Sequence, residues 1–173
     1  GATISYTVSV TDTNDQTPTY SATDTTPSVA EGSTAVETNI AITDTDTGDS
    51  NTCTLAGADK DVFTCTVTAT TYTLAFTNAE DFEDPDDADD DNDYIVTVTI
   101  NDGTNGGATI SYTVTVDDAN DQTPTYSSSD TTPNIEEGNT AIETLTVTDT
   151  DSGDVNACTL AGADSGDFTC TVS

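Results

Sequence analysis

The chain carries almost no positive charge: one lysine, Lys60, stands against 33 acidic residues, and histidine, methionine and tryptophan are absent. A net charge of −32 repels phosphates and anionic lipid surfaces, because proteins bind both through Lys and Arg. The composition therefore excludes nucleic acid and insertion into a membrane as functions of this segment. Without histidine or arginine, general acid-base chemistry would fall to carboxylates alone, so we expect no enzymatic activity.

Aromatic residues are also scarce, at 6% of the sequence, and high charge with few aromatics can indicate disorder. The patterning argues against disorder here, because apolar residues alternate with Thr or Ser over 3–10, 72–76 and 94–100. β-Branched Thr suits the exposed face of a strand, whereas Val and Ile suit the inward face. We therefore predict an all-β protein, since no segment has helical periodicity.

A secretory signal, an apolar membrane span and an initiator methionine are likewise missing, and the chain opens on a strand-like pattern. We expect it to be an excerpt from a longer protein.

The sequence repeats internally with the period of a whole domain. Residues 1–20 recur as 107–126, with 17 of 20 positions identical at an offset of 106. Two later stretches recur as well, 25–38 as 131–144 and 44–65 as 149–170. The offset falls to 105 beyond Asn39, which indicates a one-residue insertion such as a β-bulge. A period of this length predicts tandem domains instead of solenoid turns.

The repeat fixes the expected domain organisation. We predict the last strand and linker of a preceding module over 1–16, a complete module over 17–116, a linker over 117–123 and the first half of the next module over 124–173. Short runs separated by turn sequences predict seven strands in the complete module, over 26–30, 35–43, 52–57, 61–68, 71–77, 93–101 and 108–116. This pattern is typical of a seven-stranded Greek-key β-sandwich.

Four cysteines form two pairs with equal spacing, Cys53 with Cys65 and Cys158 with Cys170. Zinc binding is not favoured, because the sequence has no CxxC and no histidine. We predict a disulfide in each pair, with buried free thiols as the alternative. Disulfides would place the protein outside the reducing cytosol, in an extracellular or cell-surface location.

Acidic residues gather at the predicted module ends. The linkers read DTNDQTP at 12–18 and DDANDQTP at 117–124, and DTD follows a predicted strand at 44–46 and again at 149–151. In an extended segment, side chains at i and i+2 point the same way, so two carboxylates of a DxD can meet at one ion. Carboxylate and amide oxygens suit calcium, which takes six to eight oxygen ligands. The alternative is that each Asp only begins a turn.

These motifs occur in the order that they have in the cadherin repeat. An EG glutamate, DxD, DxE and a DxND..P linker, on a seven-strand module of this length, resemble that family over nearly the whole chain. The resemblance implies calcium ions between successive modules. At the joint after the complete module it implies the ligands Glu31, Asp81, Glu83, Asp118, Asn120, Asp121, Asp149 and Asp151. At the joint before it, the implied ligands are Asp12, Asn14, Asp15, Asp44, Asp46 and Asp102.

The sequence departs from the family pattern in places. Gln16 and Gln122 stand where many cadherins carry Asn, and DFE at 81–83 replaces the more usual DRE or DYE. The phrase FEDPDDADDDNDYIVTVTINDG looks closer to cadherin-like repeats of large bacterial or archaeal surface adhesins, and no Trp is present for strand-swap adhesion. The acidic loop at 83–93 is either an additional calcium site, through Asp87, Asp89, Asp91 and Asp93, or a solvated turn.

The resulting hypothesis is a structural protein, a calcium-stiffened tandem array in a surface adhesin or extracellular filament. Neighbouring copies of the repeat are the expected partners, with strand exchange through 1–10 as one route. The alternative is a carbohydrate- or ice-binding adhesin module, although the tyrosines and Thr ladders mark no single face. Ser and Thr in the linkers would also permit O-glycosylation.

Overall fold

The computed structural model describes residues 1–21, 24–48, 50–127 and 130–172. The chain divides into two compact units, Gly1–Asp117 and Asp118–Ser173, which we call unit 1 and unit 2. Unit 1 contains the strands β1 (Thr19–Tyr20), β2 (Ser28–Ala30), β3 (Ala35–Thr43), β4 (Thr52–Ala56), β5 (Phe63–Val67), β6 (Thr71–Phe76), β7 (Asp93–Asn101) and β8 (Gly107–Asp117), and the 3-10 turn η1 (Lys60–Val62). Unit 2 contains β9 (Thr125–Tyr126), β10 (Val147–Thr148) and the 3-10 turn η2 (Ser165–Asp167).

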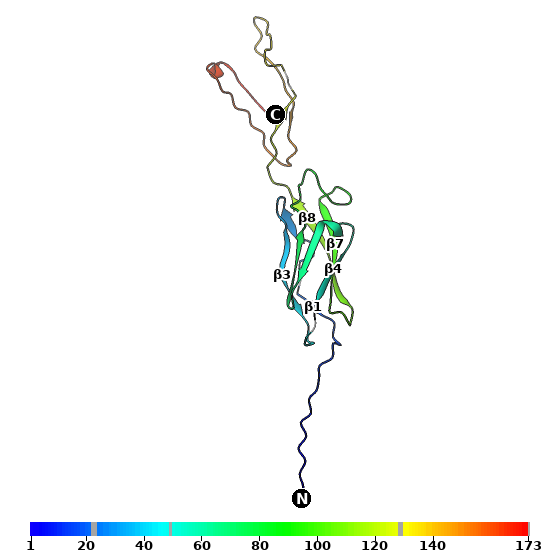
Figure 1. The fold of residues 1–173 in the computed structure, drawn as a ribbon. Coiled ribbons are helices and arrows are strands. Elements are labelled where there is room, and N and C mark those ends of the chain that lie inside the picture. The colour runs from blue at the N-terminus through cyan, green and yellow to red at the C-terminus, as the bar shows by residue number, and fades with distance from the viewer. Residues whose placement is uncertain (22–23, 49, 128–129, 173) are drawn as a thin grey trace. The chain divides into compact units, whose positions relative to one another are not determined.

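Unit 1 is a β-sandwich of two four-stranded sheets (Figure 1). One sheet has the order β1-β3-β6-β5 and the other β2-β8-β7-β4. The first segment of the module contributes to both sheets, because β1 pairs antiparallel with β3 and β2 pairs parallel with β8. The fold prediction is therefore confirmed as an all-β sandwich, and each of the seven predicted strands has a counterpart.

The core follows from the alternation of apolar and hydroxyl residues. Tyr94, Val96, Val98 and Ile100 of β7 are each 0% exposed, whereas Ile95 on the opposite face is 47% exposed. Inward side chains of β6 and β8 complete the interior, and burying each one stabilises the fold by roughly 1.5–3 kcal/mol. These are Tyr72, Leu74 and Phe76 of β6 and Tyr112, Val114 and Val116 of β8.

Two buried tyrosines share their polar groups inside this core. The hydroxyls of Tyr72 and Tyr112 lie 2.6 Å apart and form a hydrogen bond across the two sheets. A buried hydroxyl without a partner would cost about 1–3 kcal/mol, so the pair is compatible with the apolar surroundings. The bond also joins β6 to β8, which belong to opposite layers.

The predicted insertion at Asn39 coincides with an irregularity in β3. The register of β3 against β6 shifts between Glu37 and Ile40. Asn39 has φ 56°, in the left-handed region that Asn tolerates better than most residues. The extra residue is therefore accommodated as a bulge, as the change of repeat offset predicted.

The observed strand bounds differ from the predicted ones by at most two residues, and two segments differ in kind. The two-residue strand β1 was not predicted. Strand β5 begins at Phe63 because residues 60–62 form the 3-10 turn η1, in which the Val62 amide donates to the Asp59 carbonyl at 3.1 Å. Residues 1–10, predicted as a terminal strand, are extended but pair with no strand among the described residues. Their apolar side chains are correspondingly exposed, Val10 by 94%.

Both predicted disulfides are present, Cys53–Cys65 and Cys158–Cys170, which removes the alternative of free thiols. Cys53 lies on β4 and Cys65 on β5, the edge strands of the two different sheets of unit 1. The first disulfide therefore ties the two layers together along one open side of the sandwich.

Candidate metal centre

Three predicted ligands of unit 1 come together where β8 ends. Carboxylate oxygens of Glu31, Asp81 and Glu83 all lie within 4.8 Å of one another, and we call this group the EDE cluster. Glu31 follows β2 directly, and its amide donates to the Asp117 carbonyl at 3.0 Å. The next amide, that of Gly32, donates to the Glu80 carbonyl at 3.0 Å. The EG turn is thus bonded to the end of β8 and to Glu80, the residue before the DFE segment, which brings Glu31 close to Asp81.

The DFE segment has its own local order. The Phe82 amide donates to Glu31 Oε2 at 3.0 Å, and the Glu83 amide donates to Asp81 Oδ1 at 3.1 Å. The second bond is a turn closed by an aspartate side chain, which Asp forms readily two residues ahead of an amide. Together they hold the cluster without any basic side chain.

At the opposite end of unit 1, the first linker binds to the DTD loop. Asp46 Oδ2 accepts from the amides of Asp15 and Gln16 at 2.9 and 2.7 Å. Asp12 Oδ2 accepts from the amide and hydroxyl of Thr47 at 2.8 and 2.9 Å. The linker residues predicted as ligands are therefore held beside the predicted ligands of the following module.

Asn14 and Asp102 complete this end through the 102–105 turn. Asn14 Oδ1 accepts from Asn105 Nδ2 at 2.5 Å, and Asn14 Nδ2 donates to the Asp102 carbonyl at 3.5 Å. The amides of Thr104 and Asn105 donate to Asp102 Oδ1 at 2.8 and 3.0 Å. These hydrogen bonds to the charged form lower the pKa of Asp102, the Asn105 amide first, so the carboxylate stays ionised.

Two carboxylate oxygens of predicted ligands at this end are buried without a hydrogen-bond partner. They are Oδ2 of Asp102 and Oδ2 of Asp44, the first residue of DTD. Buried polar atoms are normally paired, and an ionised carboxylate that is only half satisfied is costly in a protein interior. A divalent cation would supply the missing partner, so the donor set at this end fits calcium.

Unit 2 repeats the arrangement with its own residues. The Gln122 amide donates to Asp151 Oδ2 at 3.0 Å, as the Gln16 amide does to Asp46. The Ser152 amide donates to Asp118, as Thr47 does to Asp12. The same linker geometry thus arises twice from two copies of the sequence.

The two linkers also share a hydrogen bond made by the glutamine that stands where many cadherins carry Asn. Gln122 Nε2 donates to Asp121 Oδ1 at 2.6 Å, and Gln16 Nε2 donates to Asp15 Oδ1 at 2.7 Å. In both linkers the longer amide orients the preceding aspartate, which is a predicted ligand.

Unit 2 also contains an acidic group that sequence reasoning identified only in part. Carboxylate oxygens of Asp149, Asp151 and Asp154 lie within 4.8 Å of one another. Asp154 was not predicted, and it accepts a hydrogen bond from Asn120, which was. The signal was present in the sequence, because the DTD motif is followed by a further Asp in both copies, DTDTGD and DTDSGD. The first copy of that residue, Asp49, lies outside the described residues.

The acidic loop at 83–93 gathers three of the four predicted carboxylates. Oxygens of Asp87, Asp89 and Asp91 lie within 4.8 Å, and the charge of Asp91 is the main cause of a raised pKa at Asp89. Asp93 faces elsewhere, since its Oδ1 accepts from Thr115 Oγ1 at 2.6 Å. Asp87 is 7% exposed and accepts hydrogen bonds from loop amides, so it closes the loop on itself.

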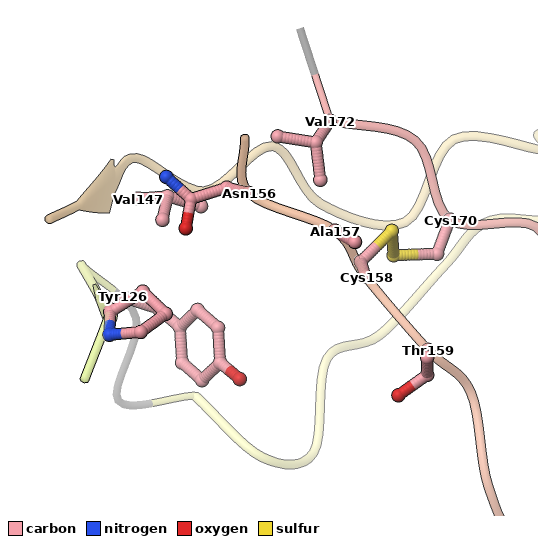
Figure 2. A pocket seen from close by; sticks show the side chains of 9 residues that line it. Tyr126, Val147, Asn156, Ala157, Cys158, Thr159, Cys170 and Val172 are labelled. Carbon is pink, nitrogen blue, oxygen red and sulfur yellow. A yellow bond between two sulfur atoms is a disulfide. The ribbon is translucent and has the colours of Figure 1, made fainter. Parts of the chain in front are cut away.

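A pocket of about 260 Å³ lies in unit 2 between Tyr126, Val147 and the Cys158–Cys170 disulfide (Figure 2). The repeat equivalents of its lining in unit 1 include Tyr20, Ile42 and Cys53, which pack in or against the core. We therefore interpret the pocket as the inner face of a sandwich layer and not as a binding site.

Comparison with known proteins bears on the fold. No protein-family model and no curated protein sequence matches the chain. Solved structures do match: repeats EC21-23 of human CDH23 are 24% identical with a TM-score of 0.59, covering 83% of this chain and 47% of that one. The module has the cadherin fold. Protocadherin Gamma B7 extracellular cadherin domains 1-4 are 24% identical with a TM-score of 0.56, covering 83% of this chain and 35% of that one.

A third match is a protocadherin gammaB7 EC3-6 cis-dimer, 24% identical with a TM-score of 0.53, covering 82% of this chain and 35% of that one. The chain thus spans less than half the length of each of these cadherin structures. Extracellular neighbours and two disulfides fit an extracellular location. No helix among the described residues is long and apolar enough to cross a bilayer.

Proposed function

We propose that this cadherin-like chain is a structural segment whose modules are joined and stiffened by calcium. The observation that carries the proposal is the pair of buried, unpartnered oxygens of Asp44 and Asp102, which lie where the sequence pattern predicts ligands. The EDE cluster and the Asp149–Asp151–Asp154 group support it, since each gathers three carboxylates in a small space.

Electrostatics explains why the ion would change mechanics. At 4.8 Å two carboxylates repel by about 0.9 kcal/mol in water and by more where solvent is excluded. Only one basic side chain is available in the whole sequence, and Lys60 pairs with the adjacent Asp61. Divalent cations would convert repelling groups at a linker into shared ligands, so a flexible joint would become a rigid one.

Affinity for calcium is expected near 10⁻⁴–10⁻³ M, the range of extracellular modules. Such a site would be filled in calcium-rich surroundings and empty inside cells. The proposed setting is therefore a surface adhesin or an extracellular filament built from many copies of the repeat. The comparisons do not support a bacterial or archaeal source, which stays a prediction from the sequence.

Small-angle X-ray scattering of the 173-residue chain, with calcium and with a chelator, tests the proposal. Calcium should give the scattering of rigidly linked units, and the chelator should give that of flexibly linked ones. A variant with Asp149→Asn and Asp151→Asn, two predicted ligands of the joint between the two units, should require more calcium for the same change. Identical profiles with and without calcium, together with no bound calcium by elemental analysis, would refute the proposed function.

A further inference from the structure

Phe82 lies between Asp81 and Glu83 in the sequence, and hydrogen bonds hold both its amide and its carbonyl. Its amide donates to Glu31 Oε2, whereas its carbonyl accepts from Asn92 Nδ2 at 3.0 Å. Asn92 therefore contacts the residue between the two DFE carboxylates, Asp81 and Glu83. It lies outside the four liganding motifs of the cadherin resemblance, the EG glutamate, DxD, DxE and the DxND..P linker.

Asn92 is itself fixed by three separate parts of the module. It is only 9% exposed, and its backbone carbonyl accepts from the Val116 amide of β8 at 3.0 Å. Its own amide donates to Asp87 Oδ2 at 2.6 Å. Its φ of 64° lies in the left-handed region, which turns the acidic loop into β7.

Asp87 holds the acidic loop in the conformation that presents Asn92. Besides Oδ2, its Oδ1 accepts from the amides of Asp89 and Asp91 at 3.0 and 3.3 Å, and from that of Asp90. One buried carboxylate thus satisfies four consecutive amides of a loop in which like charges repel. Such hydrogen bonds to an ionised acceptor are among the stronger ones in proteins.

We propose that Asn92, held by Asp87, is a positioning residue for calcium at the EDE cluster. The inference rests on the proposed function and adds a role for the acidic loop. Asn92 would keep the Phe82 peptide, and with it Asp81 and Glu83, in the liganding arrangement before the ion arrives. Preorganisation of this kind raises affinity because less ordering is left to occur on binding. Outer partners of metal ligands typically contribute 10- to 100-fold in affinity.

A calcium titration of the full chain, monitored by the NMR chemical shifts of backbone amides, tests this proposal. One titration reports on both ends of unit 1. The Phe82 and Glu83 amides report on the EDE cluster, and those of Asp15 and Thr47 report on the opposite end of unit 1. Asn92→Gly removes only the side chain, because glycine adopts the left-handed backbone freely. It should raise the calcium midpoint at Phe82 and Glu83 by about 10- to 100-fold and leave the other midpoint within about twofold.

Two further variants separate the positioning effect of Asn92 from the effect of negative charge in the loop. Asp89→Asn removes one negative charge from the same loop, and the Asp89 amide donates to Asp87 and not to the DFE segment, so the substitution should change the Phe82 midpoint much less. Asn92→Asp keeps the side-chain size but loses the Nδ2 donor, so it should weaken calcium binding as Asn92→Gly does. If Asn92→Gly shifts both midpoints equally or neither, or if Asp89→Asn has the larger effect, the positioning role is overturned while calcium binding stands. Absence of any calcium response in the unchanged chain would instead overturn the proposed function.

Discussion

Asp81→Asn should change stability in opposite directions with and without calcium. The substitution removes one charge from the EDE cluster and keeps the Oδ1 that accepts from the Glu83 amide. Asp81 has two like-charged neighbours, Glu31 and Glu83, with oxygens within 4.8 Å. Each pair repels by about 0.9 kcal/mol in water, and screening at 0.15 M salt reduces the sum of the two to roughly 1 kcal/mol. In buffer with a calcium chelator, the free energy of unfolding of the variant should therefore exceed that of the unchanged chain by about 1 kcal/mol.

With calcium the sign should reverse. At a calcium concentration of 100 times the dissociation constant, binding stabilises the folded state by about 2.7 kcal/mol. If loss of a charged ligand weakens binding by about 100-fold, most of that stabilisation disappears, and it exceeds the relief of repulsion. The variant should then be less stable than the unchanged chain by roughly 1 kcal/mol.

Urea unfolding followed by far-ultraviolet circular dichroism gives both values. Asp24→Asn is a matched control, because Asp24 Oδ1 also accepts from an amide two residues ahead, that of Thr26 at 2.9 Å, outside the acidic clusters. Its effect should have the same sign in both buffers. A change of equal sign and size for Asp81→Asn with and without calcium would refute the reasoning.

Two further predictions concern stability. Replacing Cys53 and Cys65 together by Ser should lower the unfolding free energy by about 3 kcal/mol, as expected for a sequence separation of 12, and a loss below about 1 kcal/mol in urea unfolding would contradict the entropic argument. Burial, and then the charge of Asp24, raises the pKa of Glu37 above its ordinary 4.5. The folded state therefore binds this proton more tightly than the unfolded state, and stability falls as pH rises from 4.5 through the raised pKa. Glu37→Gln should be more stable at pH 7, with an advantage that fades below pH 4.5; an advantage independent of pH would exclude this cause.

The fold was largely predictable because its signal is local. Alternation over 94–100 gives β7 directly, and the repeat offset locates the bulge at Asn39. The two-residue β1 is too short for any periodicity, and its existence depends on pairing with β3. Residues 1–10 have the same pattern as β8 but pair with no strand in the part of the chain that the structure describes, because a strand also requires a neighbour.

The candidate site was predictable in residue type and only partly in arrangement. Repeated motifs identified Glu31, Asp81 and Glu83, which the structure brings together. The role of Asn92 could not be predicted, since it depends on a left-handed backbone and on a carbonyl ten residues earlier. Asp154 was not predicted because it lies three residues beyond Asp151, outside the i, i+2 spacing of the DxD motif.

The parallel pairing of β2 with β8 has a mechanical consequence. Ser28, Val29 and Ala30 pair with Thr115, Val116 and Asp117, so the first and last parts of the module lie side by side with the same direction. Tension applied along the chain would pull these two strands past each other lengthwise. Their hydrogen bonds would be loaded together instead of opening one after another. The module of unit 1 would therefore resist stretching where its first and last strands pair.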